Sequence, residues 1–187
     1  GFSQEIEKVE SEPWLNDQGY YKPKYDSQQI KVHFNITPIL SPDNSKETII
    51  KMIDSSEDSI FVQQFYIKNW SVKINPFLEH LLRAAERGCE VRILLDSTWY
   101  NTEENEIDND DIVNFLNEYS RKYNCTLKAR LISKEHGFSK VHNKGMIIDG
   151  RKVLISSINW NSNSVLQNRE VGIIVDNKEV GKYFLDI

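Results

Sequence analysis

The chain has 187 residues, of which 39% are hydrophobic and 27% charged, as is usual for a globular domain of this size. Its 23 basic and 28 acidic residues give a formal net charge of −5, which excludes a strongly basic nucleic-acid binder at the level of the whole chain. No apolar run is long enough to span a bilayer as a helix.

Much of the acidity lies in a single segment. Residues 103–111 hold six acidic side chains and no basic one, and elsewhere 23 basic residues face 22 acidic ones. We expect this segment to be the solvated entry to a helix, because carboxylates stabilise the N-terminal end of a helix dipole. The rest of the surface is then nearly neutral.

In chain order, residues 1–30 show no periodicity and contain Pro13, Gly19 and Pro23, which predicts an extended arm or linker. From residue 31 onward, strand-like and helix-like segments alternate. The expected strands are 32–40, 59–67, 90–96, 127–132, 144–149, 153–157 and 170–176. The expected helices start at Ser45, Pro76, Ile112 and Glu179. The pattern predicts one α/β domain over residues 31–187, with a mixed, largely parallel sheet sandwiched by helices.

The polar residues of the segment 141–172 form a pattern that can carry chemistry. His142 and Lys144 are two residues apart, so on a strand their side chains share one face. Asp149 has the opposite parity and precedes Gly150, a pair typical of a two-residue hairpin turn. We therefore expect Asp149 to support the site indirectly or to act as a structural turn residue.

Ser157 and Asn159 follow the next expected strand and again share parity. Sites in open α/β sheets collect at strand ends, so a histidine, a lysine, a hydroxyl and an amide can converge there. This set suits a phosphodiester. Lysine and the neutral donors can bind the non-bridging oxygens, and histidine can attack phosphorus or transfer a proton.

The pattern His142-x-Lys144-x4-Asp149-x6-Ser156-Ser157-x-Asn159 resembles the HKD motif of the phospholipase D superfamily. Ser156 stands where the family usually has glycine. The resemblance covers residues 32–187, because the segments AAERGCEVRILLD (84–96) and NREVG (168–172) are also similar to parts of such domains.

The resemblance implies a metal-independent, two-step displacement without a cofactor. One histidine attacks phosphorus to form a phosphohistidine, a second histidine protonates the leaving oxygen, and water or an alcohol then attacks. The resemblance makes His142, Lys144, Asn159 and Glu170 the catalytic set, with Lys144, Ser157 and Asn159 binding the phosphate. It also makes Glu170 the acid that holds the catalytic histidine in its working tautomer.

The chemistry of this family needs two such motifs, and the chain contains one. His33, His80 and His136 are not followed by lysine two residues later. The second motif can come from the mate in a two-fold homodimer. It can also come from the missing half of a longer parent chain, which the polar opening arm and the final helix, cut at Ile187, favour. In either case we expect an isolated monomer to be inactive or weakly active.

Three functions follow as hypotheses. We favour hydrolysis or transphosphatidylation of a phospholipid head group, because the net charge and the acidic segment disfavour a polyanion. A nuclease of the same superfamily is the second, and it would need a local basic groove, for which Lys128, Arg130, Lys134, Lys140 and Lys144 are the candidates. A half-domain that only binds or scaffolds is the third. We expect a cytoplasmic or peripheral membrane location and leave an extracellular one open.

Overall fold

The computed structural model describes residues 25–31, 33–70, 73–98, 108–133 and 140–186. Most of the expected N-terminal arm and most of the acidic segment lie outside these residues. In the described part the strands are β1 (Asn35–Ser41), β2 (Ser59–Gln64), β3 (Glu90–Leu95), β4 (Leu127–Leu131), β5 (Lys144–Ile148), β6 (Lys152–Ser156) and β7 (Glu170–Asp176). The helices are α1 (Ser45–Asp54), α2 (Pro76–Glu86), α3 (Asn109–Tyr123), α4 (Ser162–Leu166) and α5 (Lys178–Leu185).

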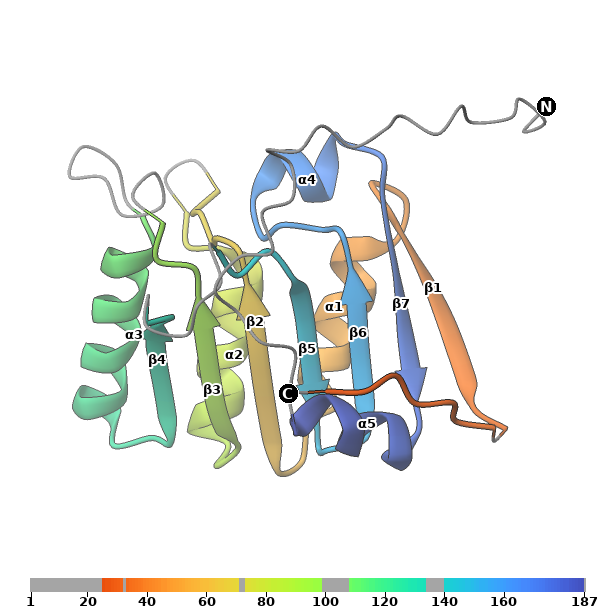
Figure 1. Ribbon diagram of the computed structural model, residues 1–187. Coiled ribbons are helices and arrows are strands. Elements are labelled where there is room, and N and C mark those ends of the chain that lie inside the picture. Colours follow the sequence, from red (N-terminus) through yellow and green to blue (C-terminus); the bar gives the residue numbers. More distant parts are fainter. Residues whose placement is uncertain (1–24, 32, 71–72, 99–107, 134–139, 187) are drawn as a thin grey trace, which may run out of the picture.

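The described strands form one seven-stranded sheet in the order β1-β7-β6-β5-β2-β3-β4 (Figure 1). The α/β class and the mixed sheet are confirmed, but the sheet is not largely parallel. Only β2–β3 and β3–β4 pair in parallel, and the other four pairings are antiparallel. The two parallel pairs are joined by crossover connections through the longer helices α2 and α3, whereas β5 and β6 are joined by a tight turn that imposes antiparallel pairing.

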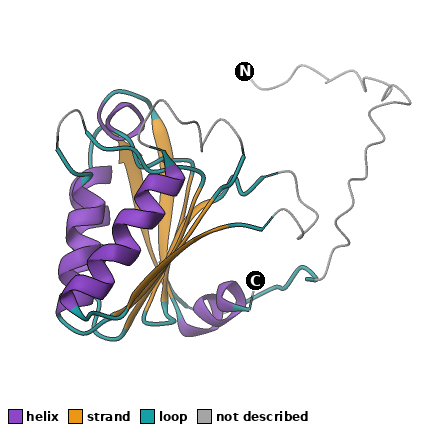
Figure 2. Ribbon diagram, turned by 90° about the vertical axis from the view of Figure 1, so that its left-hand side faces the viewer, coloured by secondary structure: helices purple, strands orange, loops and turns teal. Residues whose placement is uncertain are grey.

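The helices cover the two faces of the sheet unequally. Helices α1, α2 and α3 lie on one face, and α5 alone lies on the other, near one end of the strands (Figure 2). The helix-covered face holds the core, where Trp160 is fully buried and its ring centroid lies 5.0 Å from that of Phe77 on α2. The expected sandwich is therefore incomplete in the described residues, and we call the second surface the open face.

The open face is apolar where it spans β6, β7 and β1. Cross-strand pairing puts Ile155 opposite Ile173, and Val171 opposite Leu40, so these side chains share this face. All four are exposed, and Val171 is the most exposed of them at 59%. A sheet surface of this composition is typical of a face that another layer covers.

The turn between β5 and β6 is held by Asp149. Asp149 and Gly150 have φ values of 52° and 59°, as expected of a two-residue hairpin turn with both central residues left-handed. The Asp149 carboxylate accepts hydrogen bonds from the backbone N–H groups of Asp58 and Ser59 (both 2.9 Å) and of Glu57 (3.1 Å). Asp149 therefore ties the end of β5 to the start of β2.

Two opposing effects set the pKa of Asp149. Burial would raise it, but the three backbone N–H donors and the nearby charge of Lys152 outweigh burial, and the pKa lies below 3.8. The carboxylate form thus stabilises the folded state at neutral pH. That contribution is lost as the pH falls through the lowered pKa of Asp149.

We expect Asp149→Ala to lower the free energy of unfolding by about 1–3 kcal/mol at neutral pH, because it removes a charged acceptor from three backbone donors. Asp149→Asn should cost less, since its amide oxygen can keep the bonds to Asp58 and Ser59. Urea denaturation of the two variants and the wild type measures this, and the difference should shrink at low pH. An Asp149→Ala variant as stable as the wild type at pH 7 would contradict the assigned role.

Candidate active site

The residues of the predicted motif gather at the end of the sheet opposite the β5–β6 turn. We call this end of the sheet, where the strands begin or end, the edge, in contrast to an outermost strand. Strands β2, β3 and β6 end at this edge, and β5 and β7 begin there (Figure 1). The register pairs Lys144 with Ser156, and Ser156 with Gly172. Lys144, Ser157 and Glu170 are thus supplied by three neighbouring strands or by the residue that follows one of them.

Lys144 is a buried cation, with only 5% of its surface exposed. Its ammonium donates a hydrogen bond to the backbone carbonyl of His142. It also lies over the ring of Phe65, with Nζ 5.1 Å from the ring centroid. A carbonyl and an aromatic face compensate in part for the lost hydration of the charge. The ammonium of Lys144 keeps donors available for an anion.

His142 is exposed and lies beside the same aromatic ring. The His142 and Phe65 rings meet edge to face, with centroids 4.6 Å apart. Nζ of Lys140 lies 5.9 Å from the Phe65 centroid. No hydrogen bond to the His142 ring is present within the described ranges of the chain. The ring is therefore positioned by packing and is open to a ligand.

The environment lowers the pKa of both His142 and Lys144. For the largely exposed His142, the first cause is the partial desolvation of the ring against its neighbours, followed by the positive charges of Lys144 and Lys140, and the charge of Asp96 opposes them in part. For Lys144, burial lowers the pKa, the charge of Glu170 opposes it, and Lys140 lowers it further. A lowered pKa keeps the His142 ring neutral at neutral pH, which is the form that a nucleophile or general base requires.

Glu170 organises the β6–β7 side of the edge. It accepts hydrogen bonds from the Ser157 hydroxyl and from Nδ2 of Asn168 (3.3 Å). The negative charge of Glu170 acts to raise the pKa of Lys144. The hydrogen bonds of Glu170, however, are to Ser157 and Asn168 rather than to His142. Control of the His142 tautomer by Glu170 therefore stays a prediction.

Asn159 follows β6 and is half-buried, and its side-chain oxygen Oδ1 is buried without a hydrogen-bond partner in the described structure. Asp149, in contrast, lies at the far end of β5, where its oxygens bind backbone N–H groups. The structure thus brings His142, Lys144, Ser157, Asn159 and Glu170 to one edge and leaves Asp149 out.

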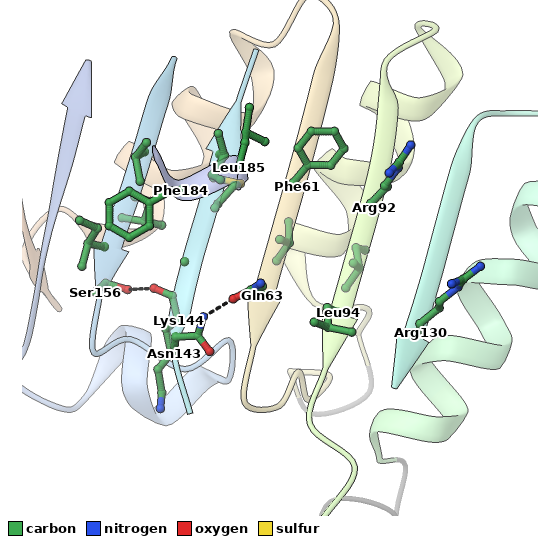
Figure 3. Close-up of a pocket in the computed structure, with 18 of the residues that line it drawn as sticks. Phe61, Gln63, Arg92, Leu94, Arg130, Asn143, Lys144, Ser156, Phe184 and Leu185 are labelled. Atoms are coloured by element: carbon green, nitrogen blue, oxygen red, sulfur yellow. Dashed lines mark hydrogen bonds between the residues drawn. The ribbon is translucent and has the colours of Figure 1, made fainter. Parts of the chain in front are cut away.

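A cavity of about 620 Å³ runs along the open face from this edge (Figure 3). Lys144, Asn143 and Ser156 lie at one end, and Phe184 and Leu185 of α5 lie at the other. Arg92 and Arg130 line the β3–β4 side. The Lys144 side chain shares the parity of Met146 on the helix-covered face, so the cavity adjoins the candidate site from the other face, and it is apolar on one side and cationic on the other.

Comparison with known families places these residues in a recognised domain. Residues 49–187 match the family described as "Cardiolipin synthase, PLD-like domain", which covers most of the chain and all of the predicted motif. The chain belongs to the phospholipase D superfamily. The HKD motif predicted at residues 142–159 lies within the matched range.

Named relatives agree with this membership, and solved structures share the fold. The chain is 27% identical over 165 residues to a phospholipase D of Rickettsia felis, a match that covers 82% of this chain and 71% of that protein. It is similar in fold to Nuc of Salmonella typhimurium, a phospholipase D family member, with a TM-score of 0.65 and 22% identity over 82% of this chain and 91% of that one. NucT from Helicobacter pylori gives a TM-score of 0.64 at 20% identity, over 82% of this chain and 92% of the other.

Two residues beside the predicted HKD motif were not predicted from the sequence. Phe65, just after β2, carries the ring that His142 and Lys144 share. Asp96, just after β3 and fully buried, accepts a hydrogen bond from the backbone N–H of Val141 (2.8 Å) and so fixes the approach to His142. A carboxylate directly after a buried strand is a signal that could have identified Asp96, whereas nothing in the sequence singles out Phe65.

Within the described residues, no group of three or more His, Cys, Asp or Glu side chains is arranged to hold a metal ion. None of the helices described has the length and apolar character needed to cross a bilayer.

We expect the His142 ring to titrate below 6.5, the ordinary histidine value, in an NMR pH titration of the four histidines. Lys144→Met should raise the His142 pKa towards 6.5, because the charge of Lys144 lowers this pKa more than the charge of Lys140 does. Lys140→Met is the matched control and should raise it less. A His142 pKa at or above 6.5 in the wild-type protein would contradict this electrostatic account.

Proposed function

We propose that this domain supplies one HKD half-site of an enzyme that cleaves or transfers a phosphodiester through a phosphohistidine. The observation that carries the proposal is the exposed His142 ring beside the buried ammonium of Lys144, on the sheet edge that also holds Asn159. A neutral imidazole next to an unneutralised cation suits a substrate that is attacked at phosphorus and carries negative charge on oxygen.

In the first step, a nitrogen lone pair of one histidine forms a bond to phosphorus, and the bond from phosphorus to the leaving alcohol breaks. The second histidine, protonated, gives its proton to the leaving oxygen. In the second step, that histidine takes a proton from water or an acceptor alcohol. The resulting oxygen nucleophile displaces the first histidine from phosphorus. Hydrolysis and transphosphatidylation differ only in which hydroxyl attacks.

The residues at the edge have different roles in these two steps. Lys144 and Asn159 neutralise and hold the non-bridging oxygens, with the Ser157 hydroxyl as a third donor. Donors fixed before the reaction stabilise the charge that develops on these oxygens, which is commonly the largest catalytic contribution. Glu170 holds Ser157 in place and, in the assembled site, orients a histidine.

The open face favours a partner that brings the second HKD motif. Its exposed apolar residues on β6, β7 and β1 lie beside Glu170 and Ser157, so a partner covering them would reach the site. A second copy of this chain or the other half of a longer parent protein satisfies this requirement. Either one would convert a half-site into a site with two histidines.

A phospholipid head group is the favoured substrate. The relatives at 27% identity are named phospholipase D, and the family description names cardiolipin synthase. The apolar side of the cavity also suits an amphiphile, and contact with a membrane surface would then be peripheral. Nucleic acid is the second candidate, because exposed Lys128 and Arg130 give β4 a cationic surface on the open face.

The covalent step can be tested with a ³²P-labelled phospholipid in micelles and, in parallel, with labelled single-stranded DNA. After an alkaline quench, which preserves phosphohistidine, wild-type protein should carry label from the phospholipid and His142→Asn should carry none. His80→Asn is the matched control, since His80 lies on α2 and pairs with Asp54 (2.7 Å), and it should label normally.

Label retained in His142→Asn would show that another residue is the nucleophile and would contradict the role of His142. Label from DNA alone, weakened steeply by salt, would replace the phospholipid by nucleic acid as the substrate. A protein with a complete site that binds these substrates without turnover or label would be a scaffold.

The need for a second motif predicts that activity follows the assembled form. Where the partner is a second copy of this chain, Ile173→Glu puts a charge on the open face and should abolish self-association in sedimentation velocity, with a loss of diester cleavage of about 100-fold or more. Phe115→Glu, at an exposed apolar position on α3, is the control and should change neither property. Robust cleavage by a verified monomer would contradict the half-site proposal.

A further inference from the structure

Two consecutive glutamines end strand β2, and their side chains point to opposite faces of the sheet. Gln63 is half-buried on the open face and accepts a hydrogen bond from Asn143 (Figure 3). Gln64 is fully buried on the helix-covered face, with 0% of its surface exposed. Neither Oε1 nor Nε2 of Gln64 has a hydrogen-bond partner in the described structure.

An unpaired amide inside a protein opposes folding, because both its donors and its acceptor have lost water and gained nothing in return. Nearly all buried polar groups in native proteins are paired. An apolar residue of the same length would pack at this position without that cost. Exceptions of this kind collect at functional sites, where a ligand supplies the missing partner.

The β2–β5 register, continued by one position, places Gln64 beside Lys144. In the β2–β5 ladder Val62 pairs with Met146 and Gln63 pairs with Gly145, so the next position sets Gln64 opposite Lys144. Gln64 and Lys144 also lie on the same face, the one that carries Val62 and Met146. Directly opposed residues have Cβ atoms about 4.5–5.5 Å apart, so an anion that contacts the lysine ammonium lies within reach of the glutamine amide.

Asn159 completes this set. It lies three residues after Ser156, the β6 partner of Lys144, and its Oδ1 is buried without a hydrogen-bond partner in the described structure. Only the oxygen of Asn159 is unpaired, whereas the Gln64 amide lacks partners at both Oε1 and Nε2. The Nε2 group of Gln64 and the buried Lys144 ammonium are donors, and a tetrahedral oxyanion is the ligand chemistry that accepts several donors at once.

We infer that Gln64 is a phosphate-binding residue, whose Nε2 donates a hydrogen bond to a non-bridging oxygen of the diester held by Lys144 and Asn159. This inference rests on the proposed phosphodiester function and adds a donor from β2 to a site otherwise built from β5, β6 and β7. No bond forms or breaks at Gln64, and its contribution is to hold the charged oxygens.

The test uses Gln64→Met in the full chain, a change that keeps the length of the side chain and removes both polar atoms. Without ligand, its melting temperature should equal or exceed that of the wild type. Its affinity for inorganic phosphate should fall by roughly 10- to 100-fold, as expected for the loss of one hydrogen bond to a charged oxygen. Val62→Ala, on the same strand and face, is the control and should lower the melting temperature without changing phosphate affinity.

The outcomes separate this inference from the proposed function. Wild-type protein that binds phosphate and cleaves a diester, with a Gln64→Met variant of equal phosphate affinity, would overturn the inference alone. Wild-type protein that binds no phosphate would overturn the inference and the proposed function together. If Gln64→Met does not fold, Gln64→Glu replaces it. Its carboxylate repels phosphate, so unchanged affinity in that variant would overturn the inference.

Discussion

An ammonium group with 5% of its residue exposed has lost most of the water that stabilises its charge, and the rest of the edge is arranged around Lys144 for this reason. The His142 carbonyl, the Phe65 ring and the charge of Glu170 each compensate part of the loss. None of them neutralises the cation by direct contact in the described structure. The charge that remains lowers the pKa of His142 and favours an anion at the same place.

The topology explains how so few residues can make this environment. The crossover connection through α2 brings the ends of β2 and β3 to the edge in parallel. The tight turn at Asp149 returns the chain antiparallel to β5, so that Ser156 on β6 lies opposite Lys144. The opposite end of β5 is occupied by Asp149 and three backbone donors. One end of β5 thus lies at the proposed phosphate site, and its other end ties β5 to the start of β2.

Much of this could be predicted from the sequence because the signals are local. The strand β7 and the start of α2 coincide with the expected segments, since alternation and the Asn75-Pro76 helix start are properties of short stretches. Strand β2 ends at Gln64 rather than at Ile67 as expected. Beyond Gln64 the backbone leaves the sheet and pairs with the Asn109 side chain, whose Nδ2 donates to the Phe65 carbonyl and whose Oδ1 accepts from the Ile67 N–H. These contacts span 42 or more residues, so no local pattern contains them. The five-residue helix α4, capped by Asn161, was missed because it is too short to show a period.

The same distinction applies to the site. His142, Lys144, Ser157 and Asn159 belong to one motif with fixed spacing, so the sequence identifies them together. Other strands, or the residues that follow them, supply Phe65, Asp96 and Gln64. Their place beside the motif depends on the sheet register, and a largely parallel sheet, as expected from the sequence, would have a different register. The antiparallel β2–β5 pairing sets Gln64 beside Lys144, and it could not be read from either strand alone.

The central claim is that the buried Lys144 ammonium is the anchor of a phosphate site shared with His142 and Asn159. A crystal structure of the protein soaked in tungstate, a heavy-atom analogue of phosphate, tests it most directly. The account predicts anomalous density at this edge, with tungstate oxygens within hydrogen-bonding distance of Nζ of Lys144 and of the Asn159 side chain. Tungstate bound only elsewhere, with the Lys144 ammonium still on the His142 carbonyl, would contradict it.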